Sequence, residues 1–342
     1  MKFDAVVVGG GPGGLHCARI LAESNANTLL LERNLSVGKK VCAGGITRGG
    51  LLRVLPESLL QRRFSSQLIR TRHQRATLHS KQTMLATVDR QELGAFMASE
   101  AARLGAEIIC GARLESIGHR SLIYRYQNKQ YPATFDYLIG ADGSRSKVRA
   151  SLGLQSRRSR MGIGLNYRVP GHFDDMLWHF DPSVFRSGYC WIFPHREAAS
   201  VGAYIGCSAF AANELKKNLD RWMIDCGISL DRARCEADLV NHDYCGWHFD
   251  NTFLIGDAAG LASPLTGEGI NPAVISGEAV ARTIIDSSYK AVDLKRVLRR
   301  HRSHWQMVRL AGRSRVRSLL LSEICAFALQ RSLISFEKFE MA

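Results

Sequence analysis

The opening residues of the chain alternate between short apolar runs and a stretch with helical spacing. Residues 6–8 form a β-branched apolar run, and residues 15–23 follow with the apolar spacing of a helix. A second apolar run over residues 29–31 ends on Glu32. This order predicts a strand, a helix and a second strand, the βαβ unit of α/β proteins.

Further strands and helices are predicted along the rest of the chain. In chain order they are a helix over 49–63, strand-like segments over 65–88, a helix over 89–104, strands over 106–110, 112–117, 122–126 and 135–139, alternating strands with one helix near 211–226 over 158–245, a strand over 253–255, a helix over 272–287, and helices from there to residue 342.

The turn between the first strand and the first helix has the spacing G-x-G-x-x-G. Gly9 permits a tight turn, Gly11 lets the backbone approach a pyrophosphate, and Gly14 allows helix and strand to pack closely. Free N–H groups at the start of the helix favour an anion. Glu32 stands 18 residues after Gly14, where a carboxylate accepts hydrogen bonds from a ribose. These positions predict a dinucleotide site.

Two further motifs stand at predicted helix starts. Asp89 suits an N-cap, and Arg90 is a planar charged donor that could reach back to a pyrophosphate or ribityl chain. Alone, this pair would be better interpreted as an N-cap followed by a surface arginine. Asp142 follows an apolar strand and begins the pattern D-G-x-x-S-x-V-R, in which its carboxylate anchors the turn. We expect Asp142 to be partly structural with or without a ligand.

The most specific motif follows the predicted strand over 253–255. Gly256 and Asp257 stand at the strand end, where the carboxylate is placed to bind a sugar-alcohol hydroxyl. Gly267 and Gly269 leave backbone N–H groups free at the start of the next helix. Those donors and the helix dipole favour negative charge, as on the N1/O2 edge of a reduced flavin.

All four motifs, in this order, resemble those of FAD-dependent oxidoreductases with the p-hydroxybenzoate hydroxylase fold. Within that group the chain most resembles the geranylgeranyl reductase family. Three segments carry this resemblance: 40–45 (K-x-C-x-G-G), 189–194 (Y-x-W-x-F-P) and 263–270 (close to N-P-L-T-G-E-G-I). Many members have glycine where this chain has Ala43, and lysine often stands where this chain has His195.

The resemblance implies an α/β (α+β) fold in three parts. They are a discontinuous Rossmann-like FAD-binding domain (1–70, 85–157 and 246–290), an inserted antiparallel β-sheet substrate domain (71–84 and 158–245) and a C-terminal helical region (291–342). The implied FAD-binding residues are Gly9, Gly11, Pro12, Gly13, Gly14, Glu32, Arg33, Cys42, Ala43, Gly44, Arg90, Asp142, Gly256, Asp257, Gly267, Gly269 and Ile270.

The resemblance also implies an activity, because members of the family hydrogenate double bonds in polyprenyl chains. A reduced flavin would deliver hydride, with NADPH or reduced ferredoxin as electron donor. An isolated alkene accepts hydride poorly, so a proton donor is needed. Tyr189 and Cys42 are the candidates, and His195 is a weaker third. Trp191 and Phe193 share a strand face with Tyr189 and could line an apolar tunnel, although such a face is also an ordinary core pattern.

Charge and composition limit the partners. The 342 residues carry a net charge of +15, and nine Lys or Arg and no acid lie between Lys295 and Arg317. Residues 319–334 are largely apolar. These helices could contact an anionic membrane or an acidic electron carrier, or be a solvated basic face. No nucleic-acid motif accompanies the charge, so nucleic acid is not an expected partner.

The cysteines and histidines give no metal-ligand spacing, so no metal site is expected. Nine scattered cysteines without a C-x-x-C pair favour a reducing cytosol. The first strand begins within five residues, which leaves no room for a signal peptide, and no run of about 18 apolar residues occurs. We expect a cytoplasmic protein, free or peripheral on the inner face of the cell membrane.

Two other functions remain open. A flavin monooxygenase or halogenase of the same fold would share the four FAD motifs, although the halogenase signature W-x-W-x-I-P is missing. A flavin-bound escort protein for prenylated clients would bind FAD without turnover.

Overall fold

The structure is a computed structural model, and it describes residues 1–186, 188–206, 212–231, 233–312 and 314–341. Within these residues, one sheet has eight strands in the order β17–β18–β11–β1–β2–β8, with the hairpin of β9 and β10 joined to β11. Its strands are β1 (Lys2–Val8), β2 (Thr28–Glu32), β8 (Glu107–Cys110), β9 (Arg113–Gly118), β10 (Ser121–Tyr126), β11 (Lys129–Gly140), β17 (His248–Phe249) and β18 (Thr252–Leu254).

The second sheet has the order β16–β12–β15–β14–β13–β5–β6, and it is antiparallel except where β5 meets β13. Its strands are β5 (Ser66–Thr71), β6 (Arg75–His79), β12 (Met161–Pro170), β13 (Leu177–Phe180), β14 (Tyr189–Pro194), β15 (Ala198–Ile205) and β16 (Cys235–Asn241). A third, small sheet has the order β3–β7–β4. Its strands are β3 (Gly45–Thr47), β4 (Leu60–Phe64) and β7 (Leu85–Val88).

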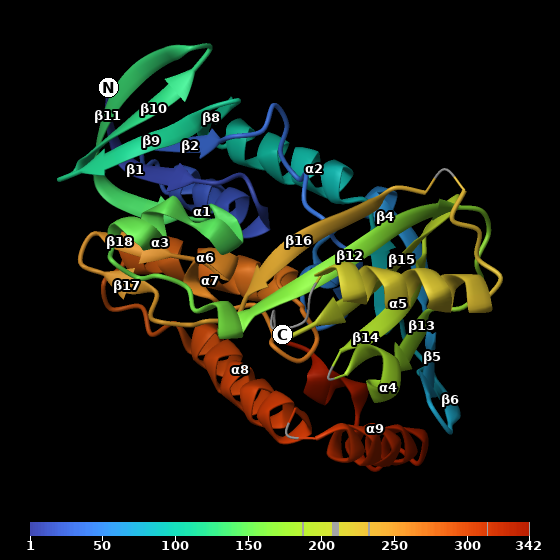
Figure 1. The fold of residues 1–342 in the computed structure, drawn as a ribbon. Coiled ribbons are helices and arrows are strands. Elements are labelled where there is room, and N and C mark those ends of the chain that lie inside the picture. The colour runs from blue at the N-terminus through green and yellow to red at the C-terminus, as the bar shows by residue number, and fades with distance from the viewer. Residues whose placement is uncertain (187, 207–211, 232, 313, 342) are drawn as a thin grey trace.

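The helices flank the two large sheets (Figure 1). They are α1 (Pro12–Glu23), α2 (Arg90–Arg103), α3 (Lys147–Ser151), α4 (Pro182–Phe185), α5 (Ala212–Asp225), α6 (Gly256–Ala259), α7 (Ile270–Ile285), α8 (Val292–Ala311) and α9 (Arg315–Gln330), and short 3₁₀ turns occur at Leu51–Arg53, Glu57–Leu59, Gly143–Arg145, Arg158–Arg160 and Phe336–Phe339. α8 leads away from the first sheet, and α9 lies beneath the second (Figure 1).

Parallel pairing brings the predicted motifs to one edge of the first sheet. β1 runs parallel to β2 and β11, and β11 runs parallel to β18, so the turns after these strands lie side by side. α1 and α7 pack closely because glycines meet there. A Cβ at Gly13 would lie 2.5 Å from the Ala273 carbonyl oxygen, and one at Gly277 would lie 2.3 Å from that of Gly13.

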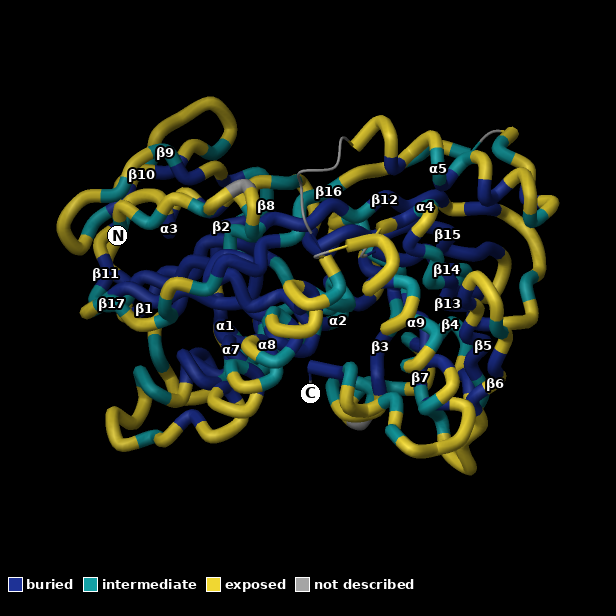
Figure 2. The backbone as a smooth tube through the Cα atoms, turned by 60° about the horizontal axis from the view of Figure 1, so that its bottom comes forward, coloured by how far each residue is buried: buried dark blue, intermediate teal, exposed yellow. Residues whose placement is uncertain are grey.

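The hydrophobic core follows the strands. β1 and β2 are buried along most of their length, whereas the β9–β10 hairpin is largely exposed at its outer end (Figure 2). Both large sheets bury apolar side chains of their own, in clusters that include Val7 and Leu30 in the first sheet and Val201 and Ala203 in the second. The mixed α/β fold expected from the sequence is therefore confirmed.

One predicted helix is wrong. Residues 49–63 form two 3₁₀ turns and strand β4, which pairs with β7. Their apolar positions imitate a helical repeat, but Pro56 has no N–H to donate and interrupts any helix there. The sheet that was expected to begin at residue 71 begins at Ser66, because β5 pairs with β13. Most other predicted elements are present, including α2, α5 and α7.

Candidate active site

The glycine-rich turn after β1 is tightly packed at two positions. Gly9 has φ +116°, and a Cβ there would lie 2.3 Å from the Ala141 carbonyl oxygen. A Cβ at Gly14 would lie 2.1 Å from the Gly9 carbonyl oxygen. Both glycines are therefore required by the fold of the turn itself, as the sequence predicts.

Gly11 differs, because the space beside it is open. It is the N-cap of α1 with φ −77° and ψ 172°, an extended backbone that any residue adopts. A Cβ there would meet no atom of the described residues within 4 Å. The fold does not need glycine at this position, so the open space fits a ligand group against the N–H groups of α1.

Glu32 lies buried at the end of β2 and ties this strand to the glycine turn. Its Oε2 accepts a hydrogen bond from the Gly10 N–H at 2.7 Å, and its Oε1 accepts from the Asn34 N–H at 2.8 Å. Asn34 Nδ2 also donates to Oε1, at 2.7 Å. A carboxylate has about four acceptor positions, so Oε2 keeps one for a ribose hydroxyl. Pro12 begins α1, and Arg33 follows Glu32 at the same edge of the sheet.

Arg90 offers the clearest unused donors for an anionic group. It stands in the first turn of α2, where the Asp89 carboxylate accepts from the N–H groups of Gln91 and Glu92. Arg90 is only 8% exposed, yet its Nε and Nη1 have no hydrogen-bond partner in the described part of the chain. A buried guanidinium without partners is unfavourable, so these donors fit an anionic ligand.

Asp142 holds the turn after β11. Its Oδ2 accepts from the Lys147 N–H at 2.6 Å and from the Val148 N–H at 3.3 Å, whereas its buried Oδ1 has no partner among the described residues. Burial raises the pKa of this carboxyl. The structural part of its predicted role is thus visible in the turn.

Asp257 lies at the start of α6 and joins three motifs. Its Oδ2 accepts from Lys40 Nζ at 2.7 Å and from Ser144 Oγ at 2.8 Å. Burial lowers the pKa of Lys40, but the charges of Asp257 and Asp238 outweigh this effect and raise it on balance. Oδ1 lies beside Gly269, where an added Cβ would come within 3.2 Å.

The N-terminus of α7 lies next to this carboxylate. Gly269 is the N-cap of the helix, and Ile270 is its first residue. Gly256 and Gly267 have φ +53° and +65°, which explains glycine at both. The donors and the positive end of the α7 dipole therefore meet Asp257 at the carboxyl edge of the first sheet.

Tyr189 connects the second sheet to the loop before α7. It begins β14, and its hydroxyl donates to the Thr266 carbonyl oxygen at 2.6 Å. Burial raises the pKa of this phenol strongly, and nearby Glu268 and Cys42 raise it further. The two predicted proton donors, Tyr189 and Cys42, are thus brought into one neighbourhood.

A cluster of buried aromatic and apolar side chains surrounds Tyr189. Trp178 is its centre, with ring centroids 4.8 Å from Phe193 and 5.4 Å from Tyr189. Trp191 lies 5.8 Å from Tyr189, and its Nε1 donates to Ser200 Oγ at 3.1 Å. We call this group the aromatic cluster; its members are Phe64, Leu85, Met176, Trp178, Tyr189, Trp191, Phe193 and Tyr204, with Ala43 packed against it.

The loop over 40–45 passes along the aromatic cluster. A Cβ at Gly45 would lie 2.7 Å from the Phe193 ring, and Gly44 has φ +76°. Cys42 Sγ accepts from the Gly44 N–H at 3.3 Å. His195 Nε2 donates to the Ala43 carbonyl oxygen at 3.3 Å, and burial lowers the pKa of His195 to about 4. The imidazole is therefore neutral near pH 7 and has no imidazolium proton to give.

Several residues of this neighbourhood could not be found from local sequence patterns. Lys40 stands in the motif over 40–45, but no local pattern pairs it with Asp257. Glu268 Oε1 accepts from Asn271 Nδ2 at 2.6 Å, and its Oε2 accepts from the Met341 N–H at 2.9 Å. Phe336 reaches Trp178, with ring centroids 5.7 Å apart. The last two contacts join segments more than 70 residues apart, which no local spacing reveals.

A family model described as the FAD binding domain matches residues 2–289. The chain belongs to this family. Its cofactor is FAD, and the open space at Gly11 and the unpartnered donors of Arg90 fit that group.

Relatives of this FAD-binding protein indicate which type of oxidoreductase it is. It is 29% identical to digeranylgeranylglycerophospholipid reductase 2 of Methanothermobacter thermautotrophicus, over 95% of this chain and 88% of the relative. It is 27% identical to the digeranylgeranylglycerophospholipid reductase of Methanocaldococcus jannaschii, over 87% and 82%. These matches confirm an FAD-dependent oxidoreductase of the geranylgeranyl reductase type.

Solved structures agree on the fold. A geranylgeranyl bacteriochlorophyll reductase-like protein from Thermoplasma acidophilum has a TM-score of 0.85 and 23% identity, and the match covers 99% of this chain and 94% of that one. The p-nitrophenol 4-monooxygenase of Pseudomonas putida has a TM-score of 0.73 and 18% identity, over 99% and 98%. At these identities the likeness establishes only the shared fold.

The described residues give two further findings, on membrane spans and on metal sites. None of the described helices combines the length and the apolar character needed to cross a bilayer. The same residues contain no group of three or more His, Cys, Asp or Glu arranged to hold a metal. Cys207 lies outside the described residues, and the other cysteines are free.

The open space at Gly11 allows a test that separates cofactor binding from folding. We expect Gly11→Val to fold normally, because its backbone is extended and its Cβ meets no protein atom. The added isopropyl group should exclude the pyrophosphate, so flavin absorbance of the purified protein should be nearly lost. Gly164→Val is the control, since a Cβ there also meets nothing within 4 Å but lies in β12. Full retention of FAD by Gly11→Val would contradict the assignment.

Proposed function

We propose that this flavoprotein reduces carbon–carbon double bonds in the polyprenyl chain of a lipid or quinone. The observation that carries the proposal is the buried aromatic cluster beside the loop over 40–45. A long alkene without polar groups needs such an apolar, water-excluded surface. The names of the relatives support a geranylgeranyl lipid as the substrate class.

Reduced FAD would supply the hydride. The chain must then hold the alkene against the cofactor and provide a proton to the other carbon. We propose Tyr189 for this task, because it belongs to the aromatic cluster and its hydroxyl reaches the loop before α7. Cys42 is the alternative donor. Trp191 would act through its ring surface, because its N–H is already bonded to Ser200.

We propose the same FAD-binding residues that are expected from the sequence. Arg90 and the N–H groups after Gly11 would hold the pyrophosphate, and Glu32 the ribose. Asp257 would bind the ribityl chain, and the N-terminus of α7 would stabilise negative charge on the reduced ring. We assign residues 1–65, 85–157 and 246–290 to FAD binding and residues 66–84 and 158–245, which include β5 of the second sheet, to the substrate.

A product analysis without oxygen tests the activity. The holoenzyme, reduced with dithionite, is incubated with a digeranylgeranyl glycerophospholipid, and the lipid is examined by mass spectrometry. Products heavier by two hydrogens for each reduced bond are expected. A product formed only in air with NADPH, and heavier by one oxygen, would instead support a monooxygenase. Bound FAD with no product under either condition would support an escort protein.

We propose either NADPH or a reduced ferredoxin as the electron donor. Anaerobic mixing of the oxidised holoenzyme with each donor, followed by flavin absorbance, distinguishes them. The faster reductant at equal concentration is the donor that the enzyme uses.

We also propose that α9 attaches the enzyme to the inner face of an anionic membrane. Val316, Leu320, Ile324 and Phe327 recur at helical spacing, and all four are exposed. These four residues form what we call the α9 face, and arginines stand at both ends of the helix, at positions 315, 317 and 331. Apolar side chains bordered by arginine suit the interface of a bilayer with anionic lipids.

The opposite side of α9 fixes its orientation. Ala326 and Leu329 are buried against Ile69 and Leu78 of the second sheet. Glu323, the only acid of the helix, accepts from Thr71 Oγ1 at 2.8 Å and from the neighbouring turn. The helix thus turns its acid inward and the α9 face outward. The free cysteines suit a cytosolic location.

Replacing Ile324 by glutamate should release the protein from vesicles. Ile324 is 62% exposed, so the change should leave folding intact while it places a charge on the α9 face. We expect binding to anionic vesicles to fall about tenfold or more. Ile224→Glu is a matched control, because Ile224 is 63% exposed on α5. Equal vesicle binding by both variants would contradict the proposal.

A further inference from the structure

A groove on the outer side of α8 is not used by the proposed reduction. It consists of two adjoining hollows of about 390 Å³ each, which share Arg160 and Trp305. Arg302, Trp305 and Arg309 recur at positions i, i+3 and i+7, so they lie on one side of the helix. We call this feature the α8 groove.

The α8 groove has positive charge in excess. Its lining includes Arg160, Arg302 and Arg309 and contains no carboxylate. Arg302 and Arg309 form no salt bridge within the described part of the chain. Arg160 shares the fully buried Asp243 with Arg149 and Arg157, so three guanidinium groups meet one carboxylate. The guanidinium groups of Arg160, Arg302 and Arg309 therefore keep N–H donors for an anion that enters the groove.

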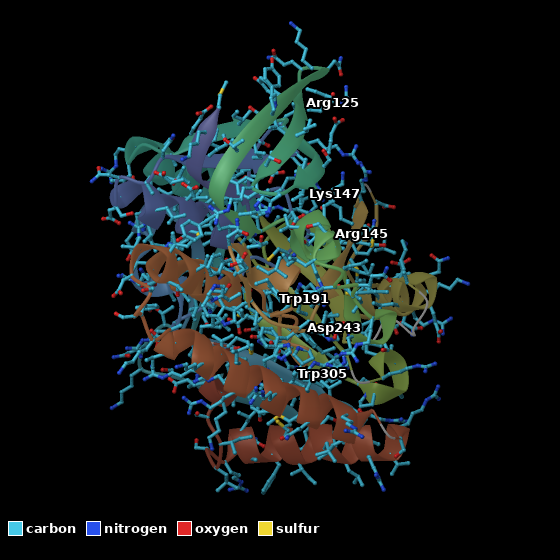
Figure 3. All side chains as sticks on the ribbon, turned by 90° about the vertical axis from the view of Figure 1, so that its left-hand side faces the viewer. Arg125, Arg145, Lys147, Trp191, Asp243 and Trp305 are labelled. Carbon is cyan, nitrogen blue, oxygen red and sulfur yellow. The ribbon has the colours of Figure 1, made fainter. Side chains whose placement is uncertain are left out.

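Trp305 gives the groove a fixed flat surface. Its Nε1 donates to the His242 carbonyl oxygen at 3.1 Å, and the Arg160 guanidinium lies 5.0 Å from the ring centroid. In the view of Figure 3, Trp305 lies below Asp243, and Arg145 and Lys147 lie above both. His301 also lines the groove; it is 4% exposed, and its Nε2 has no partner among the described residues.

The groove lies close to the active site. His304, on the inner side of α8, bonds through Nδ1 to Ser263 Oγ at 2.9 Å. The Ser263 carbonyl oxygen accepts from the hydroxyl of Tyr204, which belongs to the aromatic cluster, at 3.2 Å. Helix α8 and the loop beginning at Ser263 therefore separate the groove from the aromatic cluster.

From this geometry we propose that the α8 groove binds a phosphate or diphosphate group of a ligand of the enzyme. Planar guanidinium groups match phosphate oxygens, and the His301 imidazole offers a further hydrogen bond. Two ligands have this chemistry: the headgroup of a prenyl lipid, and the phosphates of a nicotinamide dinucleotide. That the phosphate belongs to a prenyl lipid rests on the proposed function, whereas the presence of a phosphate site does not.

Calorimetric titration of the FAD-loaded protein with inorganic pyrophosphate tests the site without turnover. Loading with FAD keeps the probe from the cofactor position. We expect pyrophosphate to bind, and the double variant Arg302→Gln/Arg309→Gln to weaken binding about tenfold or more. Arg113→Gln, an exposed arginine on β9, is the control and should bind as the original protein does.

Competition identifies the source of the phosphate. Displacement of pyrophosphate by a short-chain prenyl phosphate assigns the groove to the lipid headgroup, and displacement by NADPH assigns it to the electron donor. Either result upholds the phosphate site, even if no double bond is reduced. No binding of pyrophosphate, or equal binding by the double variant and the control, would overturn it.

Discussion

Tyr189→Phe is expected to slow double-bond reduction about a hundredfold or more while FAD remains bound. The substitution removes one hydroxyl from the aromatic cluster and keeps the ring. The lost hydrogen bond to the Thr266 carbonyl oxygen should cost only about 1 kcal/mol of stability. The rate of product formation from dithionite-reduced enzyme measures the effect on chemistry, and flavin absorbance measures cofactor content.

Two further variants make this result specific. Tyr167→Phe also removes a buried hydroxyl, which donates to Asp220 at 2.5 Å, but it lies in β12 outside the aromatic cluster. It should retain its rate. Cys42→Ala tests the competing donor. Unchanged turnover in Tyr189→Phe together with a loss in Cys42→Ala would move the protonation from the phenol to the thiol.

Acid is expected to destabilise the fold strongly between pH 6.5 and 4. Burial lowers the pKa of five imidazoles to about 4, those of His179, His195, His242, His301 and His304. In this window the unfolded chain binds protons that the folded chain excludes, so stability falls as the pH falls. One such ring contributes on the order of 3 kcal/mol at the acid end.

Buried carboxyls act in the opposite direction. Burial raises the pKa of Glu340 to about 7, helped by the charge of Glu268. The folded chain therefore binds this proton above the pH at which the unfolded chain does, and its contribution to stability grows as the pH falls from 7 toward 4.5. Burial raises the pKa of Glu268 and Asp142 as well. Five imidazoles should outweigh these carboxyls.

Urea unfolding at a series of pH values measures the balance. The free energy of unfolding should decrease by several kcal/mol from about pH 6.5 to about pH 4.5. Glu340→Gln removes one of the carboxyls that stabilise the fold in acid. The free energy of unfolding of this variant should therefore decrease more steeply as the pH falls. Stability that stays level or increases over this range would contradict the prediction.

Local spacing explains why the cofactor motifs could be predicted from the sequence. Gly9 and Gly14 serve a turn whose atoms all lie within a few residues or on the adjacent strand end. The Asp89 cap and the Asp142 turn are likewise made by nearby backbone groups. Such short contacts impose residue types at fixed intervals, so the order of the motifs also indicates the parallel sheet that joins them.

The helix predicted over 49–63 shows where local spacing fails. Its apolar positions fit a helix, but pairing of β4 with β7 determines the structure. The same limit applies to the exposed side of α9. An apolar sequence indicates neither burial nor exposure until packing of Ala326 and Leu329 fixes which side faces outward.

The sequence by itself determined the FAD-binding fold, the four cofactor motifs and the candidate donors Tyr189 and Cys42. Only the tertiary structure decided that Lys40 pairs with Asp257, that Phe336 reaches the aromatic cluster, and that arginines gather in the α8 groove. The physical reason is distance along the chain. Steric and hydrogen-bonding demands within a turn are written in adjacent residues, whereas the partner of a distant charge or ring depends on how the sheets and helices pack.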